Sequence, residues 1–268
     1  MTRRTALVTQ AAALVGPALC VRLAASGHNL VLHHPDTALL DRLAAFDVDI
    51  EAVWSDRIAD HGTGSLASED GWIGLVDIAL ARFGRIDAAA ISPQTGNRAT
   101  FHKGAKLDTD IAIMEQMTAY LPVTMMALKA LVPPMRDAGG GQILVFTSAA
   151  GARPEALWSI YGAVRAGQNF FVRAIALEHA RDKISINAIG TKNVAFPGFP
   201  LAPADAIVED SITRGDWSVP LEAETPLGRL GTASEVAAFC MPLLDGSSAF
   251  QTGQFFAFSG GWDTAGGA

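Results

Sequence analysis

The stretch SAAGARPEALWSIYGAVR, residues 148–165, decides the fold of this chain. It follows an apolar run, Gln142–Thr147, whose β-branched and aromatic residues are typical of a buried strand. Tyr161 and Arg165 are four residues apart in the Ala-rich segment behind it, so a helix there places both side chains on one face. Ligands of open α/β sheets bind at the carboxyl ends of the strands. We therefore expect Ser148, Tyr161 and Arg165 to meet at such an end.

These three side chains suit proton transfer to and from an oxygen atom. A free tyrosine titrates near ~10, above neutral pH, and a cation one helical turn away stabilises a phenolate. Arg165 keeps its charge and acts as a fixed cation and donor. Ser148 can donate a hydrogen bond to the same substrate oxygen. A polar cluster at a helix start, without any chemistry, is the alternative, since Ser, Tyr and Arg are common residues.

Length and composition fit one large α/β domain. The chain has 268 residues, of which 50% are hydrophobic and 18% charged, enough for a sizeable core. A formal net charge of −7 argues against nucleic acid or an anionic membrane as a partner. No run is long and apolar enough to span a bilayer. Cys20 and Cys240 stand apart in apolar contexts, and we expect buried thiols and a cytoplasmic location.

Strand and helix patterns alternate along the whole chain. Strands are expected over residues 5–9, 28–33, 49–53, 86–91, 142–147, 184–189 and 254–258. Helices are expected over residues 14–27, 36–46, 72–83, 107–135, where Pro133-Pro134 end the helix, and 161–181. Asp36, and Thr232 or Ser234 together with Glu235, have the residue types of helix N-caps. This alternation predicts a single α/β domain over residues 1–268, with a Rossmann-like, doubly wound parallel sheet and helices on both faces.

The spacing of the three polar residues resembles that of a known family. Ser, twelve residues, Tyr, three residues and Lys is the pattern of the short-chain dehydrogenase/reductase superfamily, and here Arg165 takes the last position. Ser-x12-Tyr-x3-Arg resembles the halohydrin dehalogenases, the branch of that superfamily that lacks a nicotinamide cofactor. Residues 226–237, and 252–254 with 260–261, also resemble the superfamily's C-terminal region. The resemblance covers essentially the whole chain.

The first turn departs from the superfamily's dinucleotide-binding motif. Thr-Gly-x-x-x-Gly-x-Gly lets the backbone approach a pyrophosphate, but residues 9–16 read TQAAALVG, with Gln10 and Leu14 in place of two glycines. The superfamily's Asn-Asn-Ala-Gly is replaced by Ala89–Ser92, and the long helix has no asparagine. We therefore expect no nicotinamide cofactor. A reductase whose motifs have drifted is the alternative.

The dehalogenase resemblance implies a pocket for substrate and halide beside the three polar residues. Leu14 stands where that family has an aromatic residue, with plain core packing as its alternative role. Thr191, Lys192 and Asn193 occupy the place of the family's halide-binding loop, where backbone N–H groups can form an anion-binding concavity. A solvated Lys192 is the alternative. The apolar residues expected to line the rest of the pocket, with core packing as the alternative for the first, are Trp158, Phe196 and Phe199.

The reaction implied by the resemblance is halide release from a vicinal halohydrin with closure of an epoxide, without cofactor or metal. Tyr161 takes the hydroxyl proton, Ser148 donates to that oxygen, and Arg165 stabilises the phenolate. In reverse, a small anion such as azide, cyanide, nitrite or halide opens the ring. The expected partners are a halohydrin or epoxide, a small anion, and copies of the chain in a homotetramer. An NAD(P)-dependent oxidoreductase with Arg165 in place of Lys, or a non-catalytic member of the fold, is the alternative.

Overall fold

A parallel sheet of seven strands forms the centre of the protein. The computed structural model describes residues 3–58, 65–92, 110–156, 158–199, 201–203, 205–208 and 210–264. The strand order is β11-β6-β5-β4-β1-β2-β3, and each pairing is parallel. The strands are β1 (Thr5–Val8), β2 (Asn29–His33), β3 (Ile50–Val53), β4 (Ala88–Ile91), β5 (Gly141–Ser148), β6 (Ile184–Thr191) and β11 (Phe255–Phe258). The predicted Rossmann-like sheet is confirmed.

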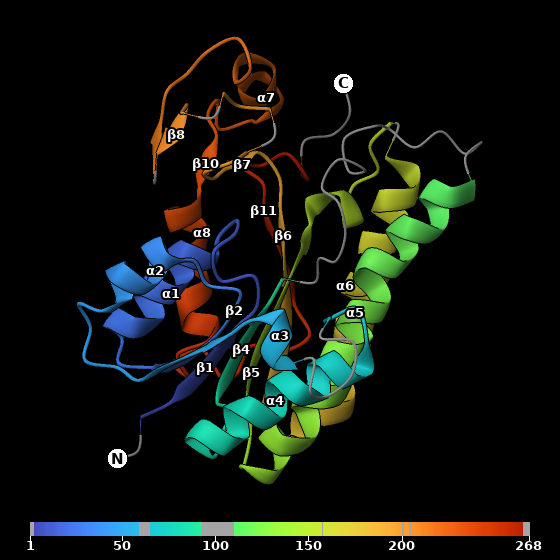
Figure 1. Cartoon of the computed structure of the whole chain (residues 1–268). Coiled ribbons are helices and arrows are strands. Elements are labelled where there is room, and N and C mark those ends of the chain that lie inside the picture. The colour runs from blue at the N-terminus through green and yellow to red at the C-terminus, as the bar shows by residue number, and fades with distance from the viewer. Residues whose placement is uncertain are drawn as a thin grey trace.

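Helices cover both faces of this sheet (Figure 1). One face carries α1 (Gly16–Ala25), α2 (Thr37–Leu43) and α8 (Ala233–Cys240). The other carries α4 (Glu69–Phe83), α5 (Asp110–Asp137) and α6 (Ser159–His179). Short helical turns near the sheet include α3 (Ser55–Ile58), η3 (Ala149–Gly151), η4 (Ala180–Asp182) and η5 (Met241–Leu243). No helix in the described part of the chain is both long and apolar enough to cross a bilayer.

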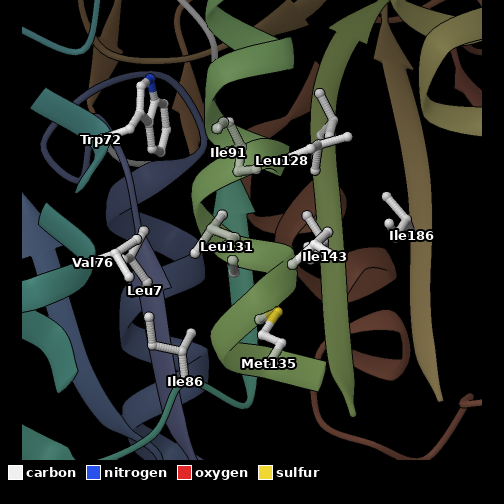
Figure 2. Close-up of a cluster of buried hydrophobic side chains, with 14 of the residues drawn as sticks. Leu7, Trp72, Val76, Ile86, Ile91, Leu128, Leu131, Met135, Ile143 and Ile186 are labelled. Atoms are coloured by element: carbon white, nitrogen blue, oxygen red, sulfur yellow. The ribbon is translucent and has the colours of Figure 1, made fainter. Parts of the chain in front are cut away.

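The core has two halves because side chains alternate across each strand. Leu7 of β1 faces the α4–α5–α6 side, while Ala6 and Val8 face the α1–α2–α8 side. Figure 2 shows the first half, where Leu131 and Met135 of α5 lie over the strand residue Ile143. The central strands are buried on both faces, which is why β1, β4 and β5 appear as mainly hydrophobic runs in the sequence.

Helix ends follow local chemistry, with one exception. The Asp36 side chain accepts from Leu39 N at 2.8 Å, and Thr232 forms a capping box with Glu235.

The prediction that Pro133-Pro134 end α5 is wrong, since the helix continues to Asp137. Proline removes one N–H but leaves its own carbonyl, and Pro134 O accepts from Ala138 N at 3.0 Å. Gly139 and Gly140, both at positive φ, end the helix instead. The predicted helix start at residue 107 lies outside the described residues.

A segment between β6 and α8 lies beyond the carboxyl ends of the central strands (Figure 1). It contains β7 (Val194–Ala195), β8 (Ile207–Val208), β9 (Ser211–Ile212), α7 (Val219–Glu224) and β10 (Gly231–Thr232). β7 pairs with β10 and β8 with β9. A small apolar cluster around Ala195, Ile207 and Leu230 holds it together. This segment forms a wall over the end of the sheet where ligands bind in such folds.

Candidate active site

One cavity of about 390 Å³ lies at the carboxyl ends of β5 and β6. The structure brings every site residue predicted from the sequence to its lining: Leu14, Ser148, Trp158, Tyr161, Arg165, Thr191, Lys192, Asn193, Phe196 and Phe199. Sequence reasoning missed other lining residues, among them Tyr120, Glu155, Leu201, Leu221 and Glu224. Most of these come from the segment beyond β6 or from α5, whose positions depend on tertiary packing.

Ser148 is the last residue of β5, beside Thr191 at the end of β6. Its Oγ accepts from Ala150 N at 3.2 Å and so caps η3. That bond uses a lone pair, and the hydroxyl proton can still be donated to a substrate. Close packing of η3 on α6 requires Gly151, because a Cβ there would lie 2.7 Å from the backbone carbon of Arg165. This contact keeps Ser148 beside the active-site helix.

Tyr161 and Arg165 lie in the first two turns of α6 and share one face, as predicted. The Arg165 Cζ lies 5.0 Å from the ring centroid of Tyr161 and 3.6 Å from that of Tyr120. The Tyr161 ring also makes edge contacts, with centroids 5.8 Å from Tyr120 and 5.5 Å from Trp158. Trp158 is therefore a pocket residue rather than a core residue. The phenol stands in an aromatic setting with a cation at its side.

A buried amide holds the far side of the guanidinium. Arg165 Nη1 donates to Gln168 Oε1 at 2.9 Å, and Gln168 Nε2 donates to Thr124 Oγ1 at 2.6 Å and to Tyr120 O at 3.2 Å. Burial raises the pKa of the Tyr120 phenol, and the positive charge of Arg165 acts in the opposite direction. One sequence signal could have identified Gln168, because it stands three residues after Arg165 and so shares its helix face.

The loop after β6 differs from the anion-binding concavity expected from the sequence. Lys192 Nζ donates to both oxygens of Glu155 at 2.9 and 3.0 Å, so its charge is paired. The backbone N–H of Lys192 donates to Phe258 O at 3.2 Å, within the sheet. The Asn193 side chain donates to Thr225 Oγ1 at 2.9 Å. These groups stabilise the wall of the cavity and leave little for a free anion.

The first turn, residues 9–16, has the backbone conformation of a glycine turn but carries side chains where that turn has none. Gln10 and Leu14 have φ values of 53° and 56°, in the left-handed region that glycine adopts most readily. Leu14 lines the cavity, and its contact with a substrate stays a prediction. Gly16 is required, because a Cβ there would lie 2.5 Å from Ala11 O. Side chains stand at two of the three glycine positions, so a pyrophosphate cannot lie as close to this backbone as to a glycine turn, and we expect a dinucleotide to bind only weakly.

The end of β2 lacks the carboxylate that would bind the ribose of a dinucleotide. Nicotinamide folds of this type place an Asp or Glu there, about 20 residues after the turn. Here the strand ends at His33, and His34 Nε2 lies 2.7 Å from Ser55 Oγ. The next carboxylate along the chain, Asp36, is engaged as the N-cap of α2. The partly exposed imidazole of His34 lies near the place where that motif has a carboxylate, while His33 is buried.

Comparison with known proteins places the chain in a family. The family model described as Enoyl-(Acyl carrier protein) reductase matches residues 11–263, nearly the whole chain. This protein belongs to the short-chain dehydrogenase/reductase superfamily. Acetoacetyl-CoA reductase of Cupriavidus necator is 27% identical over 97% of this chain and 98% of its own length. A (2S)-[(R)-hydroxy(phenyl)methyl]succinyl-CoA dehydrogenase subunit of Thauera aromatica is 30% identical over 96% of this chain and 94% of its own.

Solved structures of the same superfamily share the fold. Levodione reductase superposes with a TM-score of 0.77 at 22% identity, over 99% of this chain and 100% of its own. Acetoin dehydrogenase from Enterobacter cloacae superposes with a TM-score of 0.78 at 23% identity, over 99% and 98% of the two chains. At this level of identity the likeness speaks for the fold alone.

These comparisons correct the function expected from the sequence. The curated relatives described above are named a reductase and a dehydrogenase, so the prediction of a halohydrin dehalogenase, a carbon–halide lyase, is wrong. The oxidoreductase alternative takes its place. The structure gives a physical reason, because Glu155 neutralises Lys192 and the Lys192 amide is bonded within the sheet. As cavity-lining residues, Thr191, Lys192 and Asn193 stay predicted substrate contacts.

Proposed function

We propose that this chain is a short-chain oxidoreductase that acts at one hydroxyl or carbonyl carbon of a small, mainly apolar molecule. The observation that carries the proposal is the meeting of Ser148, Tyr161 and Arg165 in a single cavity at the carboxyl end of the sheet. The names of the relatives support the oxidoreductase class. A non-catalytic protein has no need of a hydroxyl, a phenol and a fixed cation at one point.

Each of the three residues has a role at the substrate oxygen. With NADH or NADPH as the hydride donor to the carbonyl carbon, the Tyr161 phenol would donate its proton to the oxygen that becomes a hydroxyl. In oxidation the phenolate would take that proton back, with the oxidised nicotinamide as hydride acceptor. Ser148 donates a hydrogen bond that orients the same oxygen. Arg165 stabilises the phenolate formed when the proton leaves. Apolar walls at Leu14, and at Phe196 and Phe199 beyond β6, keep water from competing for the proton.

Charge at the cavity favours an uncharged substrate. The charged residues in its described lining are two acids and two bases, Glu155, Glu224, Arg165 and Lys192, so their formal charges cancel. Lys192 lies 2.9 Å from Glu155 and 4.0 Å from Glu224, and is thus shared between them. A CoA thioester brings several phosphate charges, for which this cavity has no surplus of cations. We therefore propose a free ketone or alcohol, although relatives are named for CoA thioesters.

The test is nicotinamide-dependent reduction of a panel of small ketones. Purified protein is incubated with NADH or NADPH up to millimolar concentration, because the first turn predicts weak binding, and the loss of the reduced nicotinamide is followed. We expect turnover with uncharged ketones, less with acetoacetyl-CoA, and at least about a hundredfold less with every substrate in Tyr161→Phe. Ala166→Ser, at an exposed position of the same helix, is the matched control and is expected to behave as the parent protein. Absence of ketone-dependent turnover with either nicotinamide would refute the proposal.

Assembly and location are part of the proposal. The outer sides of α5 and α6 carry exposed apolar residues, with Met125 40%, Phe170 74% and Leu177 77% exposed. A second pair of these helices would bury them, which supports the homotetramer expected from the sequence. Cys20 and Cys240 are buried, unbonded thiols, and this supports a reducing, cytoplasmic location.

A further inference from the structure

We propose that Tyr120 and Gln168 are positioning residues that hold the Arg165 guanidinium in the one orientation that serves Tyr161. The inference rests on the proposed role of Tyr161 as the proton-transferring group. The contacts come from two helices: Tyr120 belongs to α5, while Gln168 and Arg165 belong to α6. The cation is therefore held at the α5–α6 interface and not only by its own helix.

The ring of Tyr120 is the flat support of the cation. The Arg165 Cζ lies 3.6 Å from the Tyr120 centroid, which is stacking distance, and 5.0 Å from the Tyr161 centroid. The two rings meet edge to face at 5.8 Å and 82°. The guanidinium thus lies between a fully buried tyrosine and the half-buried catalytic one. The face of an aromatic ring attracts such a stacked cation, and the attraction is stronger when the cation is desolvated.

Gln168 fixes the remaining freedom of the guanidinium. Its Nε2 donates to Tyr120 O and Thr124 Oγ1, and this leaves Oε1 facing Arg165 Nη1 at 2.9 Å. Thr124 Oγ1 in turn donates to Tyr120 O at 2.9 Å. Tyr120, Thr124 and Gln168 are each 0% exposed, so water does not compete for these bonds. The side-chain amide has one orientation that satisfies the network, and that orientation presents an acceptor to the cation.

The network explains why arginine suits this chain. An arginine side chain has several rotatable bonds, so an unsupported guanidinium would sample several positions. The planar group can stack on Tyr120 and donate to Gln168 at the same time, whereas the ammonium of lysine presents no plane to stack. Arg165, Tyr120 and Gln168 therefore form one unit. The contrary view is that Tyr120 and Gln168 only fill space between α5 and α6.

The chain offers a direct spectroscopic test, because Tyr120 and Tyr161 are its two tyrosines. In both Tyr120→Phe and Tyr120→Leu, the tyrosinate absorbance that appears on raising the pH comes from Tyr161 alone. Tyr120→Phe keeps the ring beneath Arg165, and Tyr120→Leu removes it at similar burial. We expect the titration midpoint of Tyr120→Leu to lie about one pH unit above that of Tyr120→Phe, since a displaced cation stabilises the phenolate less. Circular dichroism at each pH shows that the protein is still folded.

A second pair of variants guards against a folding failure. Gln168→Leu is placed in the Tyr120→Phe background and compared with Ala166→Ser in that background, an exposed position beside Arg165. We expect the midpoint to rise with Gln168→Leu and to stay in place with Ala166→Ser. Equal midpoints in the folded variants of both comparisons would overturn the inference. The titration uses neither substrate nor nicotinamide, so it holds even if no ketone is reduced, and the failure of one proposal is separate from that of the other.

Discussion

Arg165 is the residue at which this chain departs from the Ser-Tyr-Lys pattern of its superfamily. Its charge alone does not describe its role, because its plane stacks on Tyr120 and its Nη1 donates to Gln168. We predict that Arg165→Lys keeps the charge but lowers kcat about tenfold, since roughly 1.4 kcal/mol of stacking and hydrogen bonding is lost. Arg165→Met should lower kcat further. Steady-state kinetics at fixed pH measure both, and a lysine variant as fast as the parent would show that the plane has no role.

His33 makes stability depend on pH. It is 3% exposed at the end of β2, and burial, with His34 beside it, lowers the pKa of its imidazole from 6.5 to about 3. Between these values the unfolded chain binds a proton that the folded chain does not, so stability falls as the pH falls. The expected slope is about 1.4 kcal/mol per pH unit below about 6.5. Urea unfolding at a series of pH values should show this slope, and His33→Val should flatten it. An unchanged slope in that variant would assign the effect to other groups.

At the scale of the element, the first turn decides how a dinucleotide meets this protein. Gln10 and Leu14 hold left-handed backbone that costs a non-glycine residue about 1–3 kcal/mol each. We predict that Gln10→Gly with Leu14→Gly tightens NADH or NADPH binding about tenfold and leaves thermal stability nearly unchanged, because relief of strain offsets the lost leucine contacts. Fluorescence titration measures the affinity. The exposed substitution Ala166→Ser is the control, and equal affinities would show that the side chains do not obstruct the ligand.

The elements themselves were largely predictable. Strands buried on both faces and the caps at Asp36 and Thr232 follow from rules that act within a few residues of chain. The end of α5 was not predictable. Pro133 and Pro134 are tolerated near the end of the helix because the Pro134 carbonyl still accepts a hydrogen bond from the Ala138 N–H. The wall from β7 to β10 was missed as well. Its strands are two residues each, too short for a periodic pattern, and form only where the rest of the fold supports them.

At the scale of the whole molecule, the outer faces of α5 and α6 predict self-association. Phe170 and Leu177 are 74% and 77% exposed on one helix, an arrangement that contact with another copy would relieve. We predict that Phe170→Glu with Leu177→Glu produces a smaller species than the parent protein in light scattering coupled to size exclusion. Phe250→Glu, fully exposed and far along the chain, is the comparison. A parent protein that is already monomeric would contradict the proposed tetramer.

The residues that line the site were largely predictable from the sequence, but the partners that hold their side chains in place were not. Spacing placed Ser148, Tyr161 and Arg165 together because a strand end and one helix face fix all three. The partners of Lys192 and Arg165 were not predictable, since Glu155 and Tyr120 reach them through tertiary contacts. The function was wrong for a related reason. The missing glycines of the first turn argue against tight dinucleotide binding, but they do not identify a reaction. The names of the relatives do indicate a reaction class.

The central claim is that Tyr161 exchanges a proton with a substrate oxygen during reduction of a carbonyl. The most direct test is ketone-dependent oxidation of NADH or NADPH by the parent protein and by Tyr161→Phe, with both shown to be folded by circular dichroism. We expect turnover in the parent protein and a loss of at least about a hundredfold in the variant, the usual contribution of a general acid. Equal turnover in the two proteins would contradict it, and so would a parent protein that reduces no ketone.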